Sequence, residues 1–392
     1  MSSFKPDPST EEWRRLWDLR PDVTYLNHGS FGPAPRPVRE AWRRWNDRLQ
    51  AEPVDFFTRR LPAALDEAAG RLAAWVGTRP ENLVFVDNAT AGMNVVAGSV
   101  RLAPGDEVLI TDHDYGAAKR IWQRSCDRAG AKLVVQPVAV PIDNQQQVVD
   151  AVLQGVTPRT RLLVFSHVSS PTAIVFPAEA LCRAARERGL AVCIDGPHAL
   201  AMRDIDLDRL DCDYYTASCH KWLCAPFGSG FLYVHPRQQA SVQPALLSWG
   251  RHPPEKPEVT WRDEFIWPGT RDPSAWLAVP SAIEFLTDRV GLKLFRERTH
   301  ELARDARRRI AELTGLAPLV PDDASWYGSM ICVPLPPGDA FALHTALWRE
   351  QIEVPIIDWQ GQRLLRVSCH LYTQPEEIDR LAEALRRHLP NV

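Results

Sequence analysis

The chain has 392 residues, 45% of them hydrophobic, and a net charge of −3, which is enough material for more than one domain. No long basic block is present, which argues against nucleic acid or an anionic membrane surface as a partner. The N-terminus lacks the apolar core of a secretory signal, and no apolar run approaches the roughly 18 residues of a membrane span, so we expect a soluble cytoplasmic protein.

Strand-like and helix-like segments alternate from about residue 80 to residue 235. Predicted strands cover 82–86, 107–111, 132–135, 161–165, 190–194, 213–216 and 230–234. Predicted helices cover 89–100, 117–129, 145–154 and 178–188. Repeated units of this kind indicate an α/β fold with a mainly parallel sheet covered on both faces, in which ligands bind beyond the carboxyl ends of the strands.

The flanking segments have a different pattern. Two helices are predicted at 38–49 and 61–76, and residues 236–280 are rich in Pro, Trp and Gly. A long amphipathic helix is predicted from about 273 to 313, with a potential break near Gly291, and a small α+β unit follows. We therefore expect an N-terminal arm (1–20), a large domain (21–265) and a small C-terminal domain (266–392).

Eight cysteines are present, but none forms a CxxC pair and no Cys/His array has zinc spacing. Several lie in apolar, strand-like runs. We expect free buried thiols and no metal site.

Lys221 is one of six lysines and the one with an apolar setting, in the stretch YYTASCHKWLCAPFGSGFLYV. Apolar surroundings favour a neutral amine, which is the nucleophile that a Schiff base requires. A structural role for a partly buried lysine stays open on this observation alone.

Two further features bear on the role of Lys221. Asp195 ends a predicted buried strand, where a carboxylate needs a cationic partner such as a protonated pyridine nitrogen, although Asp before Gly is also a common turn former. Thr90 and its neighbours open a helix directly after a strand, which suits either an anion or ordinary N-capping. Ser218 and His220 flank Lys221 and could add phosphate contacts.

The ordered set DNATAGMN, DHDYGAAK, SHVSSPTA, CIDGPHAL, SCHKWLCAPFGSGFLYV and WPGTRDPS resembles the class V aminotransferase family of fold-type I enzymes, which use pyridoxal 5′-phosphate (PLP). The N-terminal YLNHGSFGPAPRPV is similar to the isopenicillin N epimerase-like branch, which also resembles the lyases of ergothioneine synthesis. The resemblance covers roughly residues 20–375. It implies the fold-type I architecture: a mainly parallel seven-stranded sheet in the large domain and a smaller α+β C-terminal domain.

The resemblance also implies a role for each matching residue. Lys221 would bind PLP as a Schiff base and then act as acid and base at Cα, through a quinonoid intermediate. Thr90, Ala91, Ser218 and His220 would contact the cofactor phosphate. Asp195 would pair with the pyridine nitrogen, His198 would lie near the phenolic oxygen, and Tyr115 would stack on the ring. Thr270 would reach the phosphate of a second subunit, which implies a homodimer with shared active sites. Asn27, His28 and Arg366 would contact the amino-acid substrate, with Arg366 at its α-carboxylate.

Two positions depart from the family pattern. The loop EVPIIDWQGQRLL lacks the reactive cysteine of the desulfurases, and Ser170 replaces an Asn of several relatives. On the resemblance to this branch alone, we rank a C–S β-elimination lyase or an amino-acid epimerase first and a class V aminotransferase second. Epimerisation needs a second base, for which Tyr115 and His28 are the candidates. A catalytically inactive binding protein with this fold, and a nucleotide-binding α/β protein without PLP, are the alternatives of a different class.

Overall fold

The computed structural model of the chain describes residues 10–250 and 260–389. Residues 1–9 of the predicted arm lie outside the described residues, as do 251–259 and 390–392. Within the described ranges, no helix is both long and apolar enough to span a membrane.

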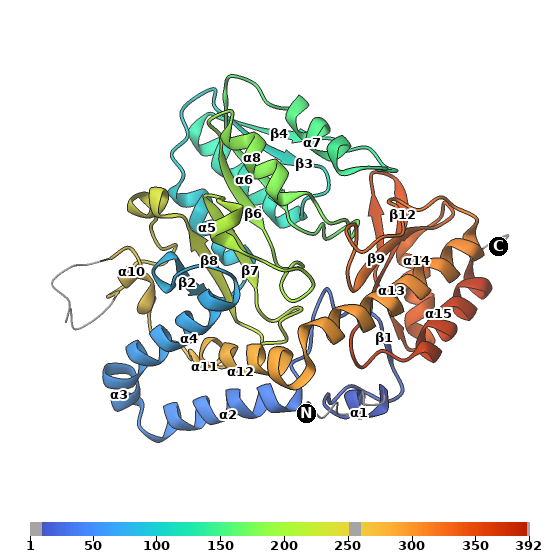
Figure 1. The fold of residues 1–392 in the computed structure, drawn as a ribbon, viewed down its shortest axis with the longest axis horizontal. Coiled ribbons are helices and arrows are strands. Elements are labelled where there is room, and N and C mark those ends of the chain that lie inside the picture. Colours follow the sequence, from blue (N-terminus) through green and yellow to red (C-terminus); the bar gives the residue numbers. More distant parts are fainter. Residues whose placement is uncertain (1–9, 251–259, 390–392) are drawn as a thin grey trace, which may run out of the picture.

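A seven-stranded sheet lies at the centre of the larger body (Figure 1). Its order is β2-β8-β7-β6-β5-β3-β4, and β8 runs antiparallel to both neighbours while the other pairs are parallel. The strands are β2 (Leu83–Val86), β3 (Glu107–Thr111), β4 (Lys132–Gln136), β5 (Thr160–Ser166), β6 (Ala191–Asp195), β7 (Tyr214–Ser218) and β8 (Gly230–Val234). The prediction of a mainly parallel seven-stranded sheet is confirmed.

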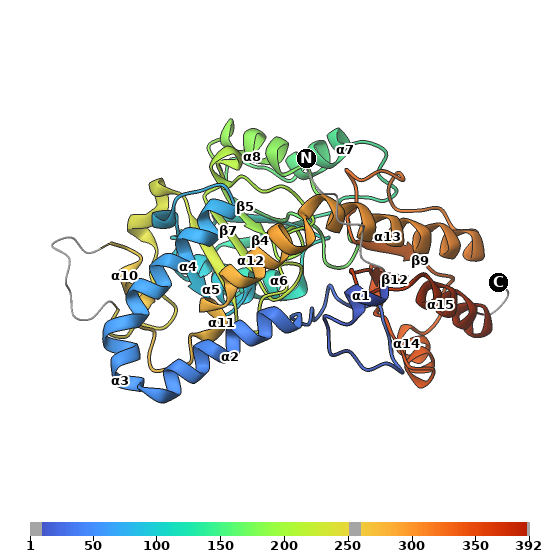
Figure 2. The same cartoon turned by 60° about the horizontal axis from the view of Figure 1, so that its bottom comes forward.

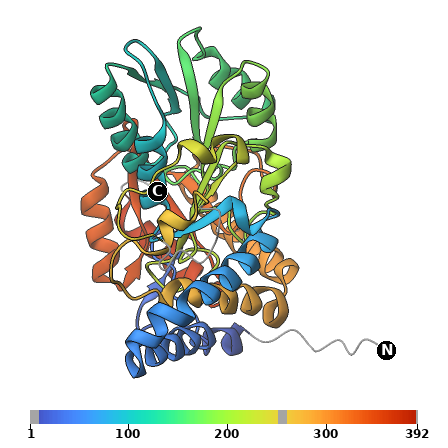
Figure 3. The same ribbon diagram turned by 90° about the vertical axis from the view of Figure 1, so that its left-hand side faces the viewer.

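Both faces of this sheet are buried under helices (Figure 3). Alternate strand residues enter different cores: Val84 and Val86 pack with Trp122 on one face, whereas Leu83 and Phe85 join the other core. The helices on the two faces are α5 (Ala89–Ser99) and α6 (Gly116–Ala129) on one, and α4 (Leu61–Trp75), α7 (Gln145–Gln154) and α8 (Ala178–Arg186) on the other.

A smaller body carries a three-stranded antiparallel sheet of order β11-β12-β9. Its elements are β9 (Met330–Pro334), β11 (Ile356–Trp359), β12 (Gln362–Ser368), α14 (Ala340–Arg349) and α15 (Pro375–His388). The N-terminal segment joins this body, because β1 (Thr24–Tyr25) pairs with β10 (Ile352–Glu353) and Arg14 of α1 (Thr10–Arg14) forms an ion pair with Glu377 (Figure 2).

The predicted long helix is divided in the structure. It consists of α11 (Ser274–Leu277), α12 (Val279–Glu284), a π-helical turn (Phe285–Val290) and α13 (Leu292–Thr314), with Gly291 at φ 87° before α13. Helices α11 and α12 contact α2 (Arg36–Ala51) and α4, whereas α13 packs on β9. We therefore propose that the two bodies meet near Gly291 rather than at the predicted boundary of 265/266. The remaining short α-helices are α3 (Pro53–Asp55), α9 (Leu207–Leu210) and α10 (Asp263–Ile266).

Helix α5 lies so close to β7 that Gly92 has no room for a side chain. A Cβ atom there would come within 2.1 Å of Thr216 Oγ1, whereas a Cβ at Gly98 of the same helix would have nothing within 4 Å. The glycine at position 92 therefore sets the position of the N-terminus of α5 over the sheet.

We predict opposite effects for the two alanine substitutions in α5. Gly92→Ala should lower the free energy of unfolding by about 1–3 kcal/mol, because Thr216 must move. Gly98→Ala should raise it by about 0.5–1 kcal/mol, because alanine is the better helix former. Denaturant unfolding of both variants checks this, and equal destabilisation by the two would contradict the close approach.

Candidate active site

The loops that leave the carboxyl ends of β5, β6 and β7 meet around one cavity of about 290 Å³. Eight of the sequence-predicted site residues line it: Thr90, Tyr115, Asp195, His198, Ser218, His220, Lys221 and Arg366. They come from both bodies, since Arg366 lies on β12 of the small sheet. Serines 30, 166 and 170 also line the cavity, and the sequence did not indicate Ser30 or Ser166.

Four predicted site residues lie outside this lining. Asn27 is buried and donates from Nδ2 to Glu353 Oε1 at 2.9 Å. The backbone N–H of Ala91 donates to the side chain of Asn88, the N-cap of α5. Thr270 is exposed, and His28 contacts the backbone of the loop that carries Lys221 (residues 219–229, called the lysine loop). Their predicted roles stay predictions.

Asp195 is buried at the cavity, and Lys221, which is half-buried as a residue, lines the cavity with its amine enclosed by the protein. Burial lowers the pKa of Lys221 to about 8, with a contribution from the charge of Arg366 and an opposing one from Asp195. Burial raises the pKa of Asp195 to about 7, against the attraction of Lys221. Asp195 Oδ1 has no hydrogen-bond partner among the described residues. The carboxylate therefore needs a donor that the described residues do not provide.

Two histidines contact Lys221 from different sides. His198 Nε2 lies 3.1 Å from Lys221 Nζ, and Trp222 Nε1 donates to His198 Nδ1 at 3.1 Å. His28 Nε2 lies 3.2 Å from the Lys221 carbonyl oxygen, and His28 Nδ1 lies 2.9 Å from the Tyr372 hydroxyl. Because a carbonyl only accepts, His28 donates from Nε2 and accepts the Tyr372 hydroxyl at Nδ1. Burial lowers the pKa of His28 to about 3, so it remains neutral.

The N-terminus of α5 forms the end of the cavity that suits an anion. Ser218 Oγ accepts the Ala89 N–H at 2.9 Å, which leaves its own hydroxyl hydrogen free to donate into the cavity. Thr90 is exposed to the cavity at the first turn of α5, where the helix dipole favours negative charge. His220 Nδ1 is buried with no partner within the described part of the chain. These groups could hold a phosphate.

Arg366 is held at the opposite wall by two serines. One amino group, Nη1, donates to the Ser170 carbonyl at 2.7 Å and lies 3.1 Å from its hydroxyl, and Nη2 donates to Ser30 Oγ at 2.5 Å. Arg366 Nε has no partner within residues 10–250 and 260–389. A fixed guanidinium with an unused N–H is suited to a carboxylate. Ser170 thus positions Arg366.

A buried cluster of His28, His370 and Cys224 lies behind the lysine loop, and the sequence did not indicate it. Cys224 Sγ is 3.4 Å from His370 Nε2 and 3.9 Å from His28 Nε2. The two imidazoles stack with centroids 4.0 Å apart and an interplanar angle of 15°. Stacked rings aim their nitrogens in parallel rather than at one point, and His28 Nε2 already donates to Lys221. We therefore assign the cluster to packing and hydrogen bonding.

All eight cysteines are free and buried, as predicted, and none lines the cavity. Cys332 Sγ contacts the Pro171 carbonyl at 3.1 Å, and Cys369 is buried in the small body. Burial raises the pKa of Cys332 to about 12, which disfavours the reactive thiolate.

Comparison with known proteins agrees with this architecture. Among curated relatives, isopenicillin N epimerase of Amycolatopsis lactamdurans is 43% identical, covering 95% of this chain and 97% of its own length. Isopenicillin N epimerase of Streptomyces clavuligerus is 39% identical, covering 96% and 97%. Among solved structures, a cystine C–S lyase in complex with its reaction product cysteine persulfide has a TM-score of 0.81 and is 23% identical, covering 94% of this chain and 99% of its own. At this level of identity, the likeness shows that the two proteins share a fold.

The family model described as Aminotransferase class-V matches residues 33–381. The resemblance drawn from the sequence motifs and the fold-type I architecture are confirmed. The chain belongs to the aminotransferase class-V family.

Proposed function

We propose that this chain is a PLP-dependent epimerase, which removes the Cα proton of an amino-acid group and delivers another proton to the opposite face of that carbon. One observation carries the proposal: a single cavity holds a buried amine, a buried carboxylate, a guanidinium and a phenol, but no thiol. The 43% identity to an isopenicillin N epimerase supports epimerisation and suggests isopenicillin N itself as a first substrate to test.

The cavity fits PLP, the cofactor of this family. The unpartnered Asp195 Oδ1 matches a ring N–H, and the groups around Thr90, Ser218 and His220 match a phosphate. Lys221 would hold the cofactor covalently through Nζ. When bound, PLP supplies an electron-withdrawing ring that makes the Cα proton of an attached amino acid removable.

The protein's own groups then divide the remaining work. Arg366 binds the substrate carboxylate, while Ser30 and Ser170 keep its guanidinium in place. Lys221 Nζ takes up the Cα proton, because its lowered pKa leaves the amine partly neutral near pH 7–8. Asp195, once paired, keeps its negative charge in the buried site.

For the second proton we propose Tyr115 rather than His28. Tyr115 lines the cavity, is about half exposed (49%), and lies near enough to Arg366 to influence its charge. His28 does not line the cavity, and both of its nitrogens are engaged by Tyr372 and Lys221. A phenol donates and accepts a proton at one atom, Oη, as a second base requires.

We propose a homodimer with shared sites and a cytoplasmic location, as expected from the sequence. Thr270 is exposed and away from the chain's own cavity, so a contact with the phosphate of a second copy is sterically available.

The first experiment is a substrate panel in D₂O, with isopenicillin N, L-amino acids and cysteine S-conjugates. We expect deuterium at Cα together with loss of optical purity.

Tyr115→Phe should retain Cα exchange, but its rate of inversion at Cα should fall by about 10²- to 10⁴-fold, because one proton transfer is removed.

Other products identify other reactions on the same scaffold. Pyruvate with ammonia would identify a β-elimination lyase, and a keto acid with aminated cofactor a transaminase. Absence of Cα exchange with every substrate would contradict the proposal.

A second prediction concerns Arg366. Arg366→Lys should weaken binding of the substrate carboxylate by about 10- to 100-fold, because the planar fork of donors is lost. The matched control is Arg363→Lys on the same strand, which lies outside the cavity lining and should leave binding unchanged. Spectral titration with an amino acid measures both, and equal effects of the two variants would remove Arg366 from its assigned role.

A further inference from the structure

Trp222, the residue that follows Lys221, has its indole ring fully buried. Its Nε1 donates to His198 Nδ1 at 3.1 Å, and the other nitrogen of His198 lies 3.1 Å from Lys221 Nζ. A continuous line of contacts thus runs from the Trp222 side chain through His198 to the amine of its own neighbour.

The chemistry of Trp222, His198 and Lys221 determines which group donates and which accepts in each of the two hydrogen bonds. An indole N–H only donates, so His198 Nδ1 accepts and carries no hydrogen. Burial lowers the pKa of His198 well below its usual range, so the imidazole is neutral. A neutral imidazole with a bare Nδ1 carries its hydrogen on Nε2. His198 Nε2 therefore donates to Lys221 Nζ, which accepts only as a neutral amine, because an ammonium group has no lone pair.

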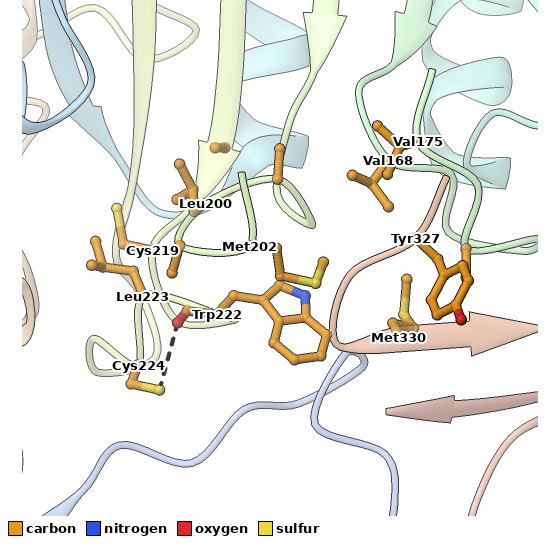
Figure 4. Packing of buried hydrophobic residues seen from close by; sticks show 14 of the residues in the cluster. Val168, Val175, Leu200, Met202, Cys219, Trp222, Leu223, Cys224, Tyr327 and Met330 are labelled. Carbon is orange, nitrogen blue, oxygen red and sulfur yellow. Dashed lines mark hydrogen bonds between the residues drawn. The ribbon is translucent and has the colours of Figure 1, made fainter. Parts of the chain in front are cut away.

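Packing keeps the indole in this orientation. Figure 4 shows Trp222 among buried side chains that include Met202, Leu223 and Met330. The ring of His28 lies against it with centroids 5.1 Å apart, and a Cβ atom at Gly29 would come within 3.4 Å of its Cζ2. The indole has little room to turn its N–H away from His198.

Several charged or titratable groups influence the pKa values of His198 and Lys221. Arg366 and Asp195 influence Lys221 in opposite directions, and Arg366 also disfavours a charge on His198. The neighbouring histidines are His28, which influences His198, and His220, which is itself influenced by Lys221. Among the described residues, the hydrogen-bond donor to His198 Nδ1 is Trp222 Nε1, and none of these charged or titratable groups takes its place.

We propose that Trp222 is a positioning residue: it fixes His198 in the Nε2–H tautomer, and His198 in turn holds Lys221 as a neutral, nucleophilic amine. The tautomer depends only on contacts within the chain. Its value for catalysis rests on the proposed function.

The test uses full-length protein from which the cofactor has been removed, with ¹⁵N-labelled histidine. Long-range ¹H–¹⁵N NMR should show His198 as the Nε2–H tautomer in the wild type and a growing Nδ1–H form in Trp222→Phe. Capture of Lys221 by pyridoxal and cyanoborohydride, followed against pH, should have its midpoint raised by about one pH unit in the variant, because loss of one hydrogen bond to the neutral amine favours the ammonium form.

The matched control is Trp13→Phe. Trp13 is also buried, but its Nε1 has no hydrogen-bond partner among the described residues, so the tautomer and the capture midpoint should match those of the wild type. An unchanged midpoint in folded Trp222→Phe would overturn the proposal. If that variant does not fold, the wild-type spectrum still decides, since an Nδ1–H tautomer there overturns it as well. Failure of the Cα-exchange experiment would leave these results unaffected.

Discussion

The burial of the Lys221 amine beside the Asp195 carboxylate is the constraint on which the rest of the site depends. Each group is removed from water, and burial pushes both toward their neutral forms. Asp195 Oδ1 has no donor among the described residues. Burying a carboxylate without a hydrogen-bond donor costs free energy of folding. A cationic ring nitrogen bound in the cavity would supply the donor that Asp195 lacks.

Both bodies of the protein are needed to hold that arrangement. Asp195 and Lys221 lie at the carboxyl ends of neighbouring parallel strands of the large sheet, whereas Arg366 comes from the small sheet. The N-terminal segment links them, because His28 donates to the backbone of Lys221 and Ser30 accepts from Arg366. A movement of one body relative to the other would therefore change the substrate end of the cavity and the lysine loop together.

The sequence predicted the parts of the site that depend on local pattern. Asp195 and Lys221 were identifiable because each follows or ends an apolar strand and the motifs occur in a fixed order. The hydrogen bonds of Ser30 and Ser170 to Arg366 were not identifiable, because the three residues lie on segments far apart in the chain. The donor role of Trp222 was missed because its position reads as apolar packing. The pairing of Thr24–Tyr25 with Ile352–Glu353 involves strands too short to leave a periodic pattern.

The most direct test of this account is to reduce the PLP-loaded full-length enzyme with borohydride and locate the modified residue by peptide mapping. The account predicts a phosphopyridoxyl group on Lys221 alone among the six lysines, and its loss in Lys221→Ala. A label on another lysine, such as the half-buried Lys119, or PLP bound without any covalent attachment, would contradict it.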